Sequence, residues 1–125
     1  MFRILIVEDN RIYRESLKDI LDDGKSPSIV VEEAENGKEA MEKADSCCPD
    51  FIFMDIGLPD ESGLELTKKI KSKYPNVCVA MLTSHDGLEY REAAIRNGAS
   101  HYLTKGNVSR EEIQNLVKSS LSEKK

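Results

Sequence analysis

The chain has 125 residues, and its 18 basic and 23 acidic residues give a net charge of −5. This length predicts one domain spanning residues 1–125, large enough to bury a core without disulfides or metals. The acidic balance argues against nucleic-acid binding by this chain, and no apolar run reaches the ~20 residues that a membrane span requires. Because no signal-peptide core follows Met1 either, we expect a cytoplasmic protein.

The three cysteines provide no framework for a disulfide or a zinc site. Cys47 and Cys48 are adjacent, Cys78 lies inside an apolar run, and no pair has the CxxC spacing. We therefore expect three reduced thiols, with Cys78 packed as a small hydrophobic residue.

Five short runs rich in β-branched and aromatic residues predict buried strands, because several are apolar at consecutive positions. They cover residues 2–7, 29–31, 51–54, 77–82 and 101–103. Between and after them, apolar residues recur at the spacing of a helix face. In chain order these faces comprise Tyr13, Leu17, Ile20 and Leu21; Ala40, Met41 and Ala44; Leu66, Ile70 and Tyr74; Leu88, Ala94 and Ile95; and Ile113, Leu116, Val117 and Leu121.

Helix-ending and helix-starting residues separate these elements. A proline precedes both the third and the fourth strand, and Asn97 with Gly98 has the composition of a helix C-terminus. Ser109 and Glu112 have the spacing of a capping box that opens the last helix. The resulting order βαβαβαβαβα predicts an α/β fold in which a five-stranded parallel sheet is doubly wound, with helices on both faces.

Charged and hydroxyl residues directly follow the predicted strands. Glu8 and Asp9 follow the first strand, Asp55 the third, Thr83 the fourth, and Lys105 comes just after the fifth. In an open α/β sheet, ligands bind outside the carboxyl ends of the strands. We therefore expect these side chains to share one edge of the sheet.

Clustered carboxylates repel one another and favour a bound cation. Mg²⁺, a hard ion that takes oxygen ligands, is the natural partner for Glu8, Asp9 and Asp55. These carboxylates carry a charge of −3, Lys105 reduces it to −2, and one Mg²⁺ brings the site to neutrality. Aspartate can accept a phosphoryl group, whose charge the metal and Lys105 would stabilise and to which Thr83 could donate a hydrogen bond.

On these residues the chain resembles the receiver domain of bacterial two-component response regulators from end to end. The resemblance rests on five segments taken together and in order. They are ILIVED at 4–9, FMDIGLP at 53–59, AMLTS at 80–84, NGA at 97–99 and YLTK at 102–105. It implies a flavodoxin-like (βα)5 fold whose strands lie in the order 2-1-3-4-5.

The resemblance implies a role for each matching site residue. Asp55 resembles the phosphoacceptor, and Lys105 resembles the phosphate-binding lysine. Glu8 and Asp9 resemble the acidic pair, in which Asp9 binds Mg²⁺ directly and Glu8 acts through water. Gly57 resembles the residue whose backbone carbonyl completes the metal shell.

Thr83 and Tyr102 resemble the switch pair of the family. In such a pair the hydroxyl moves toward the phosphoryl group and the aromatic ring turns inward, which shifts the face formed by the fourth strand, the fourth helix and the fifth strand. The chain departs from the family at Gly106, where most members have proline. His85, two residues after Thr83, is either a solvent-exposed residue without a role or one that positions water.

The implied function is a phosphorylation-dependent signalling switch rather than an enzyme, with intrinsic autophosphorylation and autodephosphorylation chemistry. A sensor histidine kinase, a phosphotransfer protein or a small phosphodonor would supply the phosphoryl group. An output domain, expected to lie outside this chain, or a separate target protein would receive the signal. Pairing of two copies through the fourth and fifth helices stays open.

Two other functions are alternatives. An aspartyl-phosphate phosphatase also forms such an intermediate, but its general acid would be Gly57, which has no side chain to donate a proton. A degenerate receiver could act only as a protein-interaction module, although the acidic pair, Asp55, Thr83 and Lys105 argue against it. Nucleotide-binding GxGxxG and GxxxxGK[ST] motifs are absent, and the acidic loop 8–10 is unlike a flavodoxin phosphate cradle.

Overall fold

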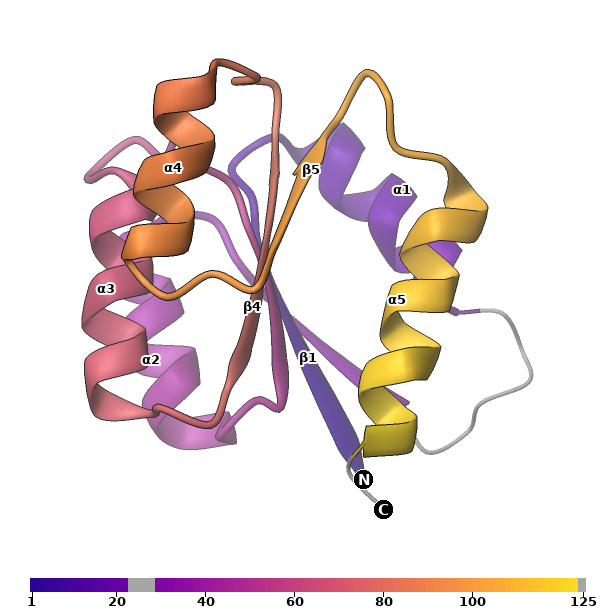
Figure 1. Cartoon of the computed structure of the whole chain (residues 1–125). Coiled ribbons are helices and arrows are strands. Elements are labelled where there is room, and N and C mark those ends of the chain that lie inside the picture. The colour runs from indigo at the N-terminus through magenta and orange to yellow at the C-terminus, as the bar shows by residue number, and fades with distance from the viewer. Residues whose placement is uncertain (23–28, 124–125) are drawn as a thin grey trace.

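The computed structural model describes residues 1–22 and 29–123, in which strands and helices alternate (Figure 1). The strands are β1 (Phe2–Val7), β2 (Ile29–Ala34), β3 (Phe51–Met54), β4 (Cys78–Thr83) and β5 (His101–Thr104). The helices are α1 (Arg11–Leu21), α2 (Gly37–Cys47), α3 (Gly63–Lys73), α4 (Leu88–Arg96) and α5 (Arg110–Glu123). The βα alternation predicted from the sequence is therefore present. None of the described helices has the length and apolar character needed to cross a membrane.

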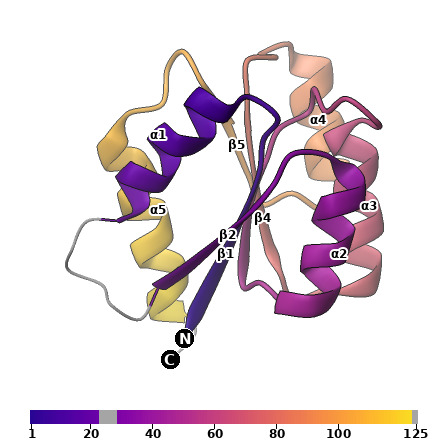
Figure 2. The same cartoon turned by 180° about the vertical axis from the view of Figure 1, so that it is seen from behind.

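The strands form one parallel sheet in the order β2-β1-β3-β4-β5. Helices α1 and α5 cover one face, whereas α2, α3 and α4 cover the other (Figures 1 and 2). The doubly wound topology and the strand order 2-1-3-4-5 are both confirmed. Because the order reverses between β1 and β3, the loops after these strands border the crevice where such sheets bind ligands.

Two apolar layers, one on each face of the sheet, form the core. Along β1, Ile4 and Ile6 pack with side chains of α1 and α5, whereas Leu5 and Val7 pack with side chains of α2, α3 and α4. All four are at most 1% exposed, and burying each contributes about 1.5–3 kcal/mol. This burial on both faces explains why the strands are apolar at consecutive positions, and it fixes the loops that follow them.

The signals predicted for the end of α4 and for the start of α5 are both confirmed. Asn97 is the C-cap of α4, and Gly98 follows with φ at +110°, a conformation that favours glycine. At the start of α5, the Glu112 N–H donates to Ser109 Oγ at 3.1 Å, and the Ser109 N–H donates to Glu112 Oε1 at 3.2 Å. This reciprocal pair is the capping box.

Replacing Ser109 by alanine is expected to lower the free energy of unfolding by about 1 kcal/mol, because an N–H at the start of α5 loses its acceptor. Urea unfolding followed by circular dichroism measures the change. Ser119→Ala, at an exposed position inside the same helix, is the matched control and should cause no loss, since alanine favours helix. Equal losses in the two variants would contradict the capping role.

Three strands differ from their predicted bounds, and the smallest difference is at β5, which ends one residue later than predicted, at Thr104. β2 continues three residues beyond its predicted end, because Glu32 and Glu33 extend the parallel ladder with β1. Their carboxylates pair with Lys43 and Lys18, each at 3.0 Å, so their weak preference for strand structure is overridden by tertiary contacts. β4 starts and ends one residue later than predicted, so Thr83 belongs to the strand.

The buried face predicted for the fourth helix is right for Ala94 and wrong for Leu88 and Ile95. Leu88 and Ile95 are 68% and 53% exposed, whereas Ala94 is fully buried. α4 packs on the core through Ala94 and Tyr90, which lie four residues apart and so share a face. Leu88 and Ile95 lie seven residues apart on another face, which is turned to solvent.

The cysteines have the states predicted from their spacing. Cys47, Cys48 and Cys78 are free thiols. Cys78 is half-buried and packs against the apolar layer of α1 and α5, and burial raises the pKa of its thiol. It therefore serves as a small hydrophobic residue.

Candidate functional site

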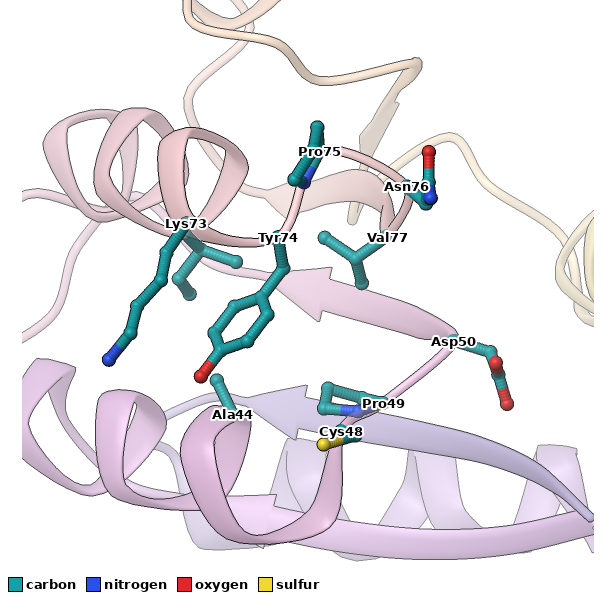
Figure 3. A pocket seen from close by; sticks show the side chains of 10 residues that line it. Ala44, Cys48, Pro49, Asp50, Lys73, Tyr74, Pro75, Asn76 and Val77 are labelled. Carbon is teal, nitrogen blue, oxygen red and sulfur yellow. The ribbon is translucent and has the colours of Figure 1, made fainter.

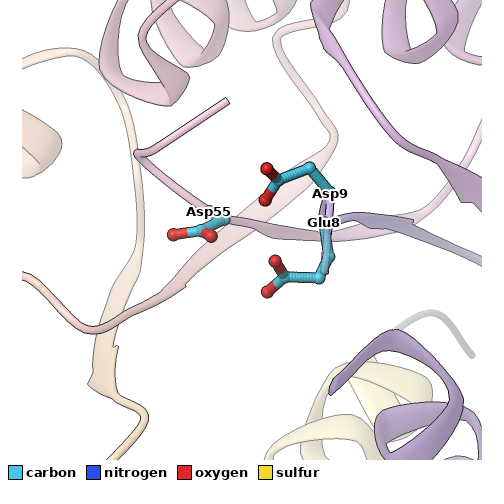
Figure 4. Close-up of side chains that lie close together, drawn as sticks. All are labelled: Glu8, Asp9 and Asp55. Atoms are coloured by element: carbon cyan, nitrogen blue, oxygen red, sulfur yellow. The ribbon is translucent and has the colours of Figure 1, made fainter. Parts of the chain in front are cut away.

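Three carboxylates meet at the carboxyl ends of β1 and β3 (Figure 4). Glu8 and Asp9 follow β1 and Asp55 follows β3, where the Asp55 N–H donates to the Val7 carbonyl at 3.0 Å. One carboxylate oxygen of each acidic residue lies within 4.8 Å of those of the other two. Glu8 and Asp55 are buried and Asp9 is exposed. The pairing of neighbouring parallel strands therefore produces the cluster predicted from the strand ends.

Lys105, just beyond β5, reaches the same cluster. Its Nζ lies 2.6 Å from Glu8 Oε1 and 3.3 Å from Asp55 Oδ2. The ring of Tyr13 lies against the same ammonium, with its centroid 4.4 Å from Nζ, a cation–π geometry. The structure thus brings together the acidic residues and the lysine, which the sequence predicted to share one edge of the sheet. It also places the ring of Tyr13, from α1, beside them.

The charges of this cluster perturb one another. Burial raises the pKa of the Glu8 carboxyl, and the charge of Asp55 adds to the rise while Lys105 opposes it. Burial by itself would lower the pKa of Lys105, but the hydrogen bond to Glu8 and the charge of Asp55 outweigh it, and the pKa is raised. Lys105 therefore stays an ammonium beside the carboxylates of Glu8 and Asp55. The remaining negative charge, carried entirely by oxygen donors, fits a hard divalent cation.

The loop between Asp55 and α3 folds back closely on Asp55. The Gly63 N–H donates to the Ile56 carbonyl at 2.9 Å, and a Cβ at Gly63 would lie 1.9 Å from the Asp55 carbonyl oxygen. Only glycine allows that approach. Gly57 is exposed at the start of this loop, and a Cβ there would lie 3.7 Å from Cε1 of His85.

Asp60, in the same loop, holds the start of α2. Its carboxylate accepts from the Gly37 N–H at 2.8 Å and from the Lys38 N–H at 3.1 Å. The first of these bonds contributes most to holding the pKa of Asp60 below its usual value. The free N–H groups at a helix N-terminus favour such an anion, so Asp60 anchors the loop to α2.

Thr83 and Tyr102 are connected through His85. The His85 N–H donates to Thr83 Oγ1 at 3.3 Å, and Nδ1 of the same histidine lies 3.2 Å from that oxygen. The hydroxyl of Tyr102 donates to the His85 carbonyl. The rings of His85 and Tyr90 pack edge to face, with their centroids 4.8 Å apart. Thr83 and Tyr102 are both buried, and burial raises the pKa of the tyrosine. His85 is therefore partly buried rather than solvent-exposed, and a role in positioning water stays a prediction.

Arg14 is a residue of this region that the sequence interpretation missed. It is 6% exposed and lies on the buried face of α1 together with Leu17 and Leu21. Its guanidinium donates to the Glu8 carbonyl and to two carboxylates at the end of β2. Its position three residues before Leu17 was the available signal, since a charge on an apolar helix face requires buried partners.

A pocket of about 400 Å³ lies away from the acidic site, between the C-terminal ends of α2 and α3 (Figure 3). Its lining comprises Ala44, Cys48, Pro49, Asp50, Ile70, Lys73, Tyr74, Pro75, Asn76 and Val77. Two of its polar groups, the Lys73 ammonium at 2.8 Å and the Tyr74 hydroxyl, bind Asp45. The carboxylates and the lysine converge at the acidic cluster instead, which is therefore the candidate functional site.

The fold and this site define a flavodoxin-like α/β domain with an acidic site at the carboxyl edge of its sheet. The chain belongs to the response regulator receiver domain family, whose model matches residues 4–118.

Two curated relatives and one solved structure illustrate the similarity. The transcriptional regulatory protein DegU of Brevibacillus brevis is 38% identical over 82% of this chain, and LnrK of Bacillus subtilis (strain 168) is 40% identical over 84%. The matches cover 43% and 47% of those proteins, so the chain spans less than half of their length. A CheY-like receiver domain protein from Methanospirillum hungatei JF-1 superposes with a TM-score of 0.89 at 30% identity, over 98% of this chain and 95% of that one.

Proposed function

We propose that this domain is a phosphorylation-dependent switch in which Asp55 accepts a phosphoryl group in a Mg²⁺-dependent reaction. The observation that carries the proposal is the position of Asp55 Oδ2, 3.3 Å from Lys105 Nζ, inside a cluster of three carboxylates. A carboxylate nucleophile, oxygen ligands for a cation and a fixed positive charge are the groups that phosphoryl transfer to aspartate requires. Membership of the receiver family supports the same function.

In the proposed step, a carboxylate oxygen of Asp55 forms a bond to phosphorus while the bond from phosphorus to the donor breaks. The donor is a phosphohistidine or a small acyl phosphate, and its imidazole or carboxylate leaves with the electron pair of the broken bond. Lys105, beside Asp55 and Glu8, is placed to stabilise the charge of the transferred group. Water later hydrolyses the aspartyl phosphate to phosphate, which returns Asp55 to a carboxylate.

The proposed Mg²⁺ ligands are Asp9, Asp55 and the backbone carbonyl of Gly57, with Glu8 acting through water. Glu8 Oε1 is already 2.6 Å from Lys105, which supports a contribution through water rather than a direct bond. When bound, Mg²⁺ would supply electrostatic stabilisation of the phosphoryl oxygens.

Thr83 and Tyr102 are the proposed switch pair. Both bond to His85, so a movement of Thr83 toward a phosphoryl group would reach Tyr102 through a single residue and would alter the face formed by β4, α4 and β5. A sensor histidine kinase or phosphotransfer protein is the proposed donor in the cytoplasm. An output domain or a separate target protein is the proposed receiver, in keeping with the greater length of DegU and LnrK.

Acetyl phosphate tests the proposal directly. Incubated with it and Mg²⁺, the protein should gain the mass of one phosphoryl group by intact-mass spectrometry. EDTA should prevent the gain, because the three carboxylates then lack their cation. Hydroxylamine, which cleaves acyl phosphates, should restore the original mass. Labelling that is insensitive to EDTA, or that survives hydroxylamine, would show that the proposed chemistry is wrong.

A further inference from the structure

Arg14 is a buried cation that lies next to the acidic site without facing it. Its side chain is 8% exposed, and each part of its guanidinium has an acceptor. Nη1 donates to the Glu8 carbonyl at 2.9 Å, Nε to Glu33 Oε1 at 2.9 Å, and Nη2 to Glu35 Oε1 at 3.2 Å. An arginine holds its donors in a fixed planar arrangement that matches these three acceptors. The compact ammonium of a lysine at this position would not reproduce that geometry.

The charge of Arg14 is balanced within its own group of partners. Glu33 also accepts from Lys18 Nζ at 3.0 Å, so two cations face the two carboxylates Glu33 and Glu35. The group sums to zero charge, and its long-range field at Asp55 is correspondingly small. What Arg14 supplies toward the acidic site is therefore a fixed hydrogen-bond donor for the Glu8 backbone.

We infer that Arg14 is a positioning residue for the acidic site: by holding the Glu8 carbonyl, it fixes the turn that carries the Glu8 and Asp9 carboxylates. The backbone N–H of Arg14 donates to the Asn10 carbonyl at 2.9 Å, so Arg14 holds both ends of this turn. The Asn10 N–H in turn donates to Glu8 Oε2 at 3.1 Å, which ties the Glu8 side chain to the same backbone. For the part that concerns a cation, the inference rests on the proposed function.

The first test needs no metal and no phosphodonor. Arg14→Met should speed amide hydrogen exchange at Asn10 by about tenfold or more, because the turn that holds the Asn10 N–H against Glu8 loses its brace. Lys18→Met is the matched control: it removes the other cation on Glu33 from the same helix but leaves the Glu8 carbonyl bonded, so exchange at Asn10 should change less than about twofold. Equal exchange in the two variants would overturn the inference.

The second test measures Mg²⁺ binding by calorimetric titration. Groups that orient metal ligands typically change metal affinity by ten- to hundredfold, so Arg14→Met should raise the Kd for Mg²⁺ by about tenfold, whereas Lys18→Met should leave it within about twofold. Arg14→Lys should fall between Arg14→Met and the wild type. If Arg14→Met does not fold, Arg14→Lys decides the question by the same two measurements, and wild-type values in both would refute the role. A wild-type protein that binds no Mg²⁺ would refute the proposed function, while the exchange at Asn10 would still decide the role of Arg14.

Discussion

Asp55→Asn is expected to abolish labelling by acetyl phosphate under conditions in which the wild-type protein is labelled. The amide that replaces the carboxylate has no anionic oxygen to attack phosphorus, and the other acids cannot substitute for it. Glu8 is held by Lys105 at 2.6 Å, and Asp9 is proposed to hold the cation. Intact-mass spectrometry with and without Mg²⁺ measures the effect.

Asp60→Asn is the matched control for this prediction, because Asp60 lies in the same loop and its carboxylate anchors α2 instead. An asparagine side chain can still accept from the Gly37 N–H, so this variant should label as the wild type does. Labelling that persists in Asp55→Asn and disappears in Asp60→Asn would contradict the prediction, because the nucleophile would then be Asp60. The circular dichroism spectra of both variants should match the wild type.

Lys105→Met is expected to impair both chemistry and stability. Labelling should fall by about hundredfold, the typical cost of removing one group that stabilises developing charge. The metal-free protein should also lose about 3 kcal/mol of unfolding free energy, because Glu8 and Asp55 would be left buried without their shared ammonium. That value is at the low end for a buried pair, since the side chain of Lys105 is 18% exposed.

The stability loss in Lys105→Met should depend on pH in a defined direction. The pKa of Glu8 is already raised by burial, and the hydrogen bond from Lys105 is what opposes the rise. Without that bond the folded protein binds the Glu8 proton still more tightly than the unfolded chain does. The variant should therefore gain stability relative to the wild type as the pH falls from 8 toward 5. Urea unfolding across this range measures the difference in stability, and Lys18→Met, at a more exposed ion pair, is the control that should show little change. A loss in Lys105→Met that stays constant with pH would contradict the coupling to Glu8.

The fold and most of the candidate site could be predicted from the sequence because they depend on periodic and local signals. Runs that are apolar at consecutive positions identify strands buried on both faces, and the residue after each strand identifies the edge of the sheet. Glu8, Asp55 and Lys105 follow from that rule alone, and the structure places them in contact. The capping box at Ser109 is equally local.

The remainder depends on contacts between segments far apart in the chain. Arg14 and its partner Glu33 are 19 residues apart in the sequence, and Asp60 and its partner Gly37 are 23 apart. The spacing of residues along the chain does not predict contacts at such separations. The prediction for α4 is wrong at Leu88 and Ile95 for a related reason. Its apolar residues do not all lie on one side, and only the packing against β5 and α3 shows that the small Ala94, rather than Leu88, faces the core.

The residues of the acidic site lie far apart in the chain, so the site forms only when the sheet has folded. Lys105 lies 50 positions after Asp55, and the two approach only through the paired strands of the sheet. A peptide containing either residue alone would lack the other, and the site would assemble in the same cooperative step as the sheet. Because the proposed phosphoacceptor is built in this way, uptake of the phosphoryl group should report the fraction of molecules that are folded. Labelling rates measured across a urea series should therefore trace the same transition as circular dichroism.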